Sequence, residues 1–92
     1  MTEVRLSRSH TLGLAGALAR AREAEADLRR HPTMRTWWEG HALRFSLAGS
    51  HGEVVIAESE VVLRIELSFF ARPLRGLVQR KAAEALDCWL AS

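Results

Sequence analysis

The sequence has a single cysteine, Cys88, so an intrachain disulfide is excluded. A small domain without disulfides must be held together by buried apolar side chains or by a partner subunit. No apolar run approaches the roughly 18–20 residues that cross a bilayer. The first five residues also lack the apolar segment of a signal peptide. We therefore expect a cytoplasmic protein, because a reducing compartment does not favour disulfides.

The sequence also lacks the residue spacings that are typical of metal, phosphate and catalytic sites. The four histidines form no H-x₃-H pair, and a lone cysteine cannot form a C-x₂-C motif. No glycine-rich loop leads from a strand into a helix, as a phosphate site requires. A catalytic cysteine would need a nearby base and an electropositive pocket, which the sequence does not indicate for Cys88. We expect no metal, no cofactor and no catalytic residue, and hence a protein that is not an enzyme.

The sequence also lacks a large excess of one charge, since 13 basic and 11 acidic residues give a net charge of +2. This value alone does not indicate a nucleic-acid-binding protein. The distribution is uneven, because Arg72 to Lys81 holds four bases and no acid, whereas Glu53 to Glu66 holds four glutamates and one arginine. Such stretches can steer a partner, although clustered charge more often forms a solvated face.

What the sequence does have is 48% apolar residues in 92 positions, which suits one domain, residues 1–92, with a thin core. Apolar spacing predicts, in order, a strand at 4–8, a helix at 11–30, strands at 43–47, 53–57 and 61–69, and a helix from Pro73 onward. Short connections favour antiparallel neighbours. Each helix has one apolar stripe, so both should pack on one face of the sheet. The predicted fold is α+β, with the order β-α-β-β-β-α.

Two aromatic pairs, Trp37-Trp38 and Phe69-Phe70, do not fit this alternation. Successive strand residues point to opposite faces of a sheet. If Phe69 joins the core face, Phe70 points away from it. One of the two tryptophans should likewise miss the core, unless Gly40 introduces a bulge. The sequence does not decide which tryptophan is exposed.

An apolar patch on or beside the open sheet face follows from this reasoning. Val62 lies on the outer side of its predicted strand and can join the exposed aromatic residues. A patch of this kind usually marks an interface, although loops or the N-terminal segment can also cover it. The predicted binding residues of this patch are Trp37, Trp38, Val62 and Phe70, with Arg72 and Arg75 as a charged rim.

Several short motifs extend over nearly the whole chain. They are His10-Thr11-Leu12-Gly13, Trp38-Glu39-Gly40, Leu43-Arg44-Phe45, a turn at Gly49-Ser50-His51-Gly52-Glu53, the strand Val61 to Leu67, and a closing helix that ends at Leu86-Asp87. In this combination the chain resembles the polyhydroxyalkanoic acid (PHA) system proteins, which are encoded beside bacterial PHA storage genes. It departs from that pattern at His41 and Ser68. The resemblance implies a genomic link to polyester storage and supplies no catalytic residues.

Three functions agree with these observations. The first is a non-enzymatic accessory protein linked to PHA storage, which docks through the apolar patch on a granule protein, on the granule surface or on a second copy as a homodimer. Such a protein would be cytoplasmic and granule-associated. The second is a small acyl-ligand-binding domain, with a cleft between the alanine-rich first helix and the sheet, lined by Trp89 and near Leu14, Leu18 and Ala21.

The third is a double-stranded-nucleic-acid-binding module that uses Arg72, Arg75, Arg80 and Lys81. The segment from Gln79 to Leu86 resembles the second helix of a double-stranded-RNA-binding domain. That domain grips phosphates with lysines at the start of the helix. Here Arg80-Lys81 lies two turns inside the helix, so this third function is disfavoured.

Overall fold

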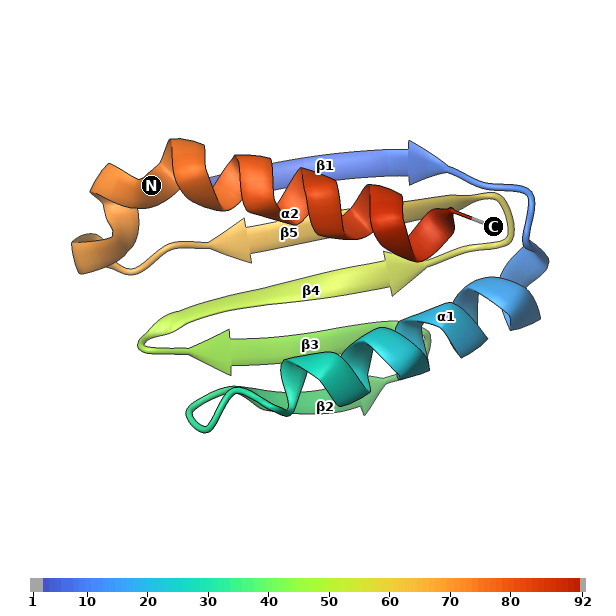
Figure 1. Cartoon of the computed structure of the whole chain (residues 1–92), viewed down its shortest axis with the longest axis horizontal. Coiled ribbons are helices and arrows are strands. Elements are labelled where there is room, and N and C mark those ends of the chain that lie inside the picture. Colours follow the sequence, from blue (N-terminus) through green and yellow to red (C-terminus); the bar gives the residue numbers. More distant parts are fainter. Residues whose placement is uncertain (1–2, 92) are drawn as a thin grey trace.

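Five strands and two long helices make up the structure, a computed structural model that describes residues 3–91. The elements are β1 (Glu3–Ser9), α1 (Gly13–Leu28), β2 (Arg35–Glu39), β3 (Ala42–Leu47), β4 (Ser50–Ile56), β5 (Glu60–Glu66), the 3-10 helix η1 (Phe69–Leu74) and α2 (Arg75–Leu90). All strand pairs are antiparallel, in the order β1-β5-β4-β3-β2. Both helices cover the same face of this sheet (Figure 1). The α+β class, the antiparallel sheet and the two helices are confirmed, and β2 adds a strand to those predicted.

The tight turns explain why β2 to β5 form a meander. Between β3 and β4, Ala48 and Gly49 both have a positive φ, of 50° and 82°, and Leu47 is paired with Ser50. Two residues with positive φ form the type I′ turn, whose twist matches that of the strands. The turn predicted at residues 49–52 is therefore misplaced, because β4 already begins at Ser50.

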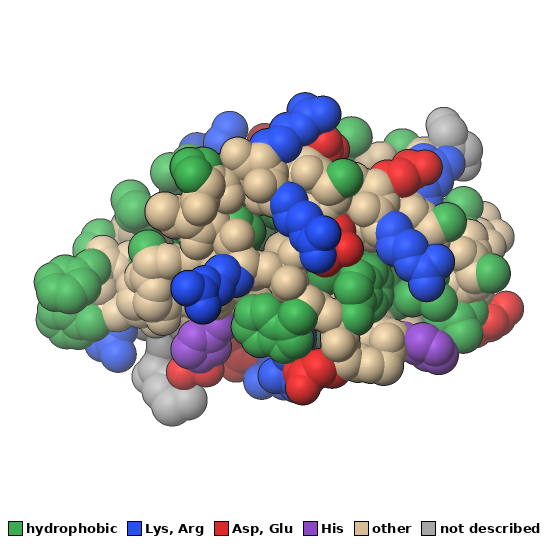
Figure 2. All heavy atoms as spheres, turned by 90° about the horizontal axis from the view of Figure 1, so that it is seen from below, with side chains coloured by type: hydrophobic (Ala, Val, Ile, Leu, Met, Phe, Trp, Pro, Cys, Tyr) green, Lys and Arg blue, Asp and Glu red, His purple; other side chains and the backbone are tan. Residues whose placement is uncertain are grey.

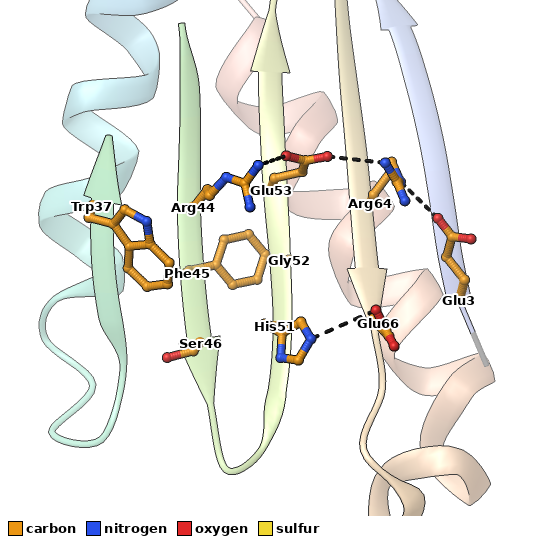
Figure 3. Close-up of a pocket in the computed structure, with 10 residues that line it drawn as sticks. All are labelled: Glu3, Trp37, Arg44, Phe45, Ser46, His51, Gly52, Glu53, Arg64 and Glu66. Carbon is orange, nitrogen blue, oxygen red and sulfur yellow. Dashed lines mark hydrogen bonds and ion pairs between the residues drawn. The ribbon is translucent and has the colours of Figure 1, made fainter. Parts of the chain in front are cut away.

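Alternation along the strands creates the core on the helix-covered face. Leu43, Val54 and Leu63 lie opposite one another on β3, β4 and β5, and each is buried. Burial of a side chain of this size contributes about 1.5–3 kcal/mol. Gly52 also faces the helices, and the ring of Phe45 on β3 lies against it (Figure 3). An aromatic ring over a strand glycine covers backbone that the glycine leaves bare.

The two helices close this face in different ways. α1 buries the small side chains Ala17, Ala21 and Ala24, so it approaches the sheet closely. α2 buries only Leu86 completely among its described side chains. α1 begins at Gly13, two residues after the predicted start at residue 11, and its first turn is held by two side chains. His10 Nδ1 accepts from the backbone N–H of Leu12, and a Glu58 carboxylate oxygen accepts from that of Leu14.

The ends of two elements also differ from the prediction. α1 ends at Leu28, before the predicted limit of Arg30. β5 ends at Glu66, so the strand predicted through Phe69 is too long. Among residues 3–91, no helix has the length and the apolar character that a membrane span requires.

Candidate binding surfaces

Large apolar side chains are exposed at one end of the molecule, where η1 joins α2. We call these four residues, Phe69, Phe70, Leu74 and Leu77, the apolar end. Phe69 is 71% exposed and Phe70 is 89% exposed. Figure 2 shows hydrophobic side chains projecting at this end, at the left of the view. Exposed apolar groups that gather in this way are typical of an interaction site.

The path of the chain after β5 explains this exposure. Leu67 is still buried, and the backbone N–H of Ser68 donates to Ser50 Oγ at 2.9 Å. The backbone N–H of Ala71 then donates to the carbonyl of Ser68, which begins the 3-10 helix. The expectation that Phe69 would face the core is therefore wrong, because the chain has left the sheet before this residue.

Positive charge borders the apolar end. The Phe69 and Phe70 rings meet edge to face, with centroids 5.6 Å apart. The guanidinium carbon of Arg72 lies 5.4 Å from the Phe69 ring centroid, within the range of a cation–π contact. Arg75 donates to the backbone carbonyl of Glu3 at 3.3 Å, which ties the start of α2 to β1. The apolar end thus has a basic border formed by Arg72 and Arg75.

Trp37 and Trp38 lie on opposite faces of β2, and the structure shows which one is exposed. Trp37 lies on the open face and is 43% exposed. Trp38 lies on the helix-covered face, where its indole N–H donates to Glu25 Oε1 at 3.0 Å. Gly40 has a positive φ and lies in the turn to β3, so it does not bulge the strand. Trp38 is therefore part of the packing between α1 and the sheet.

Glu25 is a buried carboxylate that joins α1 to the edge strand β2. Besides Trp38, it accepts from Thr36 Oγ1 at 2.8 Å and pairs with Arg29 at 3.2 Å. Burial raises the pKa of Glu25, but the hydrogen bonds from Trp38 and Thr36 and the charge of Arg29 outweigh burial. The pKa therefore lies below the ordinary value. This cluster fixes the position of β2 under the helix.

The open face of the sheet carries charges that alternate in sign across all five strands. We call the following five residues the charge ladder: Glu3, Arg64, Glu53, Arg44 and Glu39. Arg64 is 2.8 Å from a Glu3 oxygen and 3.2 Å from one of Glu53, and Arg44 is 3.3 Å from the other oxygen of Glu53 (Figure 3). Four residues of the ladder, all except Glu39, line a shallow hollow of about 530 Å³ that Trp37 also borders. Each base already has acidic partners, so the ladder carries little unbalanced charge.

The structure separates the six predicted binding residues into three places. Val62 lies on the open face in a row with Val55 and Ala42, whereas Trp37 is in the neighbouring row with Arg44. Trp38 lies on the helix-covered face. The remaining residues, Phe70, Arg72 and Arg75, lie at the apolar end.

Sequence reasoning missed the charge ladder, although its signal is present. Arg44, Glu53 and Arg64 each occupy an outward position of a strand, flanked by inward apolar residues. Alternation predicts that these residues face solvent. It does not predict that they lie opposite one another, since this depends on the register between strands.

The polar residues that most often carry chemistry have structural surroundings here. His10 is buried, and its Nε2 is 3.0 Å from the carbonyl of Ala57. Because Nδ1 accepts from Leu12, the proton must lie on Nε2, which then donates to that carbonyl. Cys88 is exposed on α2. Within residues 3–91, no group of three His, Cys, Asp or Glu side chains is placed to hold a metal ion.

Comparison with known proteins gives one family. Neither a curated protein nor a solved structure matches the chain. A family profile does match, over residues 4–90, which is nearly the whole sequence. Its description, "Putative polyhydroxyalkanoic acid system protein", agrees with the resemblance found in the sequence motifs. The chain therefore belongs to this family of polyhydroxyalkanoic acid system proteins.

Proposed function

We propose that this protein is a non-enzymatic accessory protein of the bacterial PHA storage system, and that it attaches to the polyester surface of the cytoplasmic granule through the apolar end. The observation that carries this proposal is the exposure of Phe70 and Phe69, at 89% and 71%, on a segment held by hydrogen bonds. Membership in the PHA family supports the choice of surface.

The energetics suit a reversible attachment. Burial of one large apolar side chain contributes about 1.5–3 kcal/mol, and part of the total is offset by the loss of translational and rotational freedom. The Phe69 and Phe70 rings lie side by side in an edge-to-face arrangement, so both can contact one surface at the same time. Arg72 and Arg75 border the rings, and their N–H groups can donate to ester carbonyls at a polyester surface.

A pelleting assay with purified PHA particles tests the proposal. We expect the wild-type chain to sediment with the particles and the double variant Phe69→Ser/Phe70→Ser to stay in the supernatant. Both substitutions are at exposed positions, so the fold should survive, and circular dichroism would check this. The matched control is Trp37→Ser, which removes an exposed aromatic side chain from the open face.

Two results would contradict the proposal. If the double variant pellets as well as the wild type, the apolar end is not the attachment site. If Trp37→Ser abolishes pelleting and the double variant does not, the open sheet face is the surface that binds.

A further inference from the structure

An apolar cleft lies between α1 and α2, above the middle of the sheet. The two helices diverge toward the end of the molecule where η1 lies (Figure 1). The cleft has a volume of about 630 Å³. Its floor is formed by sheet residues that include Phe45, Val54 and Ile65, and its walls by Leu28 on one side and Val78 on the other. Trp89 of α2 also lines it.

The floor of this cleft is incompletely covered by the chain itself. Phe45, Leu47 and Ile65 face the helices, yet each is only half-buried. Burial of apolar surface contributes about 25 cal/mol per Å² of area removed from water. A ligand that covered these side chains would therefore be stabilised by burial that the helices do not provide. The small side chain of Ala82 on α2 contributes to this space. The cleft thus results from the divergence of the helices and from the small side chain of Ala82.

The charge at the cleft has one sign. The lining includes Lys81 of α2 and His31, which follows α1, and none of the described lining residues is a carboxylate. Lys81 offers an ammonium group and three donors, and His31 offers a ring N–H. An open apolar groove with basic groups in its lining is complementary to a molecule that has a long apolar tail and one anionic head.

We propose that the cleft binds a single acyl chain with a free carboxylate, with the tail along Phe45 and Ile65 and the head at Lys81. Its volume falls within the roughly 300–1,000 Å³ of small-molecule sites. Leu77 belongs both to the apolar end and to the cleft lining, but Phe69 and Phe70 do not line the cleft, so the inference does not depend on the proposed granule attachment.

The apolar end of a second copy fits the cleft less well. That end is bordered by Arg72 and Arg75, whereas the cleft lining includes Lys81. Like charges brought together oppose association. A carboxylate head has the opposite charge, which favours the acyl ligand.

Titration of the full chain with dodecanoate below its micelle concentration, followed by NMR of the backbone amides, tests the site. We expect shifts at Val78, Lys81 and Ala82, and weaker binding of dodecanol, which has the same tail without the charge. Lys81→Glu should lower the affinity for dodecanoate by roughly fivefold or more, because an attraction becomes a repulsion.

A substitution that fills the cleft tests the site more directly than Lys81→Glu does. Ala82→Phe should weaken dodecanoate binding by roughly tenfold or more, because the added ring takes the space of several buried methylenes. Ala85→Phe is the matched control, since Ala85 is exposed on the same helix and does not line the cleft. If Ala82→Phe does not fold, the comparison of dodecanoate with dodecanol on the wild type decides the question.

The outcomes separate this proposal from granule attachment. Ala82→Phe should still pellet with PHA particles, and the Phe69→Ser/Phe70→Ser variant should still bind dodecanoate. The proposal is overturned if dodecanoate leaves the cleft amides unshifted, or if dodecanol binds as tightly as dodecanoate. It is equally overturned if sedimentation shows a dimer that Ala82→Phe abolishes while dodecanoate does not bind.

Discussion

At the scale of single residues, Glu25 has the greatest effect on how the edge of the sheet is held. Its carboxylate accepts from Trp38 and Thr36 and pairs with Arg29, and its residue is only 8% exposed. A buried donor that loses its acceptor costs more than the hydrogen bond itself contributes. Glu25 therefore stabilises the position of Trp38 on the helix-covered face of β2.

We expect Glu25→Ala to lower the free energy of unfolding by roughly 1–3 kcal/mol, because Trp38 and Thr36 would keep buried donors without an acceptor. Urea unfolding at neutral pH measures the change. The matched control is Glu23→Ala, at an exposed position of the same helix, which should change the stability by less than roughly 0.5 kcal/mol. Equal effects of the two substitutions would contradict this role of Glu25.

The lowered pKa of Glu25 also predicts how the effect of Glu25→Ala on stability depends on pH. The pKa of Glu25 in the folded chain lies below its ordinary value of 4.5, so the ionised carboxylate stabilises the fold. That stabilisation is complete above the ordinary pKa and is lost as the pH falls through the lowered folded value. The difference in unfolding free energy between the wild type and Glu25→Ala should be constant near neutral pH and shrink in acid. A difference that grows as the pH falls would show the opposite sign of the shift.

At the scale of elements, the packing of β4 against both of its neighbours, β3 and β5, depends on Gly52. A Cβ at this position would lie 2.6 Å from the backbone oxygen of Arg64 and 2.7 Å from the ring of Phe45. The backbone oxygen of Arg64 cannot move aside as the end of a flexible side chain can. The glycine therefore permits both the close strand pairing and the aromatic cover.

One substitution at two glycines should have opposite effects. Gly52→Ala should destabilise the fold by roughly 1–3 kcal/mol through overpacking. Gly76→Ala should stabilise it by roughly 0.5–1 kcal/mol, because the site is helical and no atom lies within 4 Å of the added Cβ. Thermal unfolding of both variants gives the comparison. If Gly52→Ala left the stability unchanged, β4 would be able to shift without loss of free energy of unfolding.

At the scale of the whole molecule, one sheet connects every element. The core residues of β3, β4 and β5 form a single cluster with Ala17 and Ala21 of α1 and Leu86 of α2. We propose that residues 1–92 fold as a single domain, because no element has a core of its own.

We therefore expect one cooperative unfolding transition in urea. Tryptophan fluorescence reports on Trp37, Trp38 and Trp89, which lie on β2 and α2, whereas far-ultraviolet circular dichroism reports on the whole backbone. The two signals should give the same midpoint if unfolding is two-state. A fluorescence change that precedes the loss of secondary structure would show that an edge of the molecule unfolds separately.

The sequence by itself determined the two helices and four of the five strands, with the faces of those strands. Alternation at Leu43, Phe45 and Leu47, and the alanine stripe of α1, follow from the periods of strand and helix, which are local properties of the backbone. The family was also recognisable from short motifs along the chain. Those signals were sufficient for the α+β class.

Only the tertiary structure decided which of two neighbouring residues is exposed and which distant residues meet. Trp38 is inside because Glu25 of α1 lies above it, and both phenylalanines are outside because Ser50 holds the chain at Ser68, where it leaves the sheet. The charge ladder depends on strand register, and the cleft depends on the angle between two helices. Local periodicity fixes neither of these, because each results from contacts between residues far apart in the sequence.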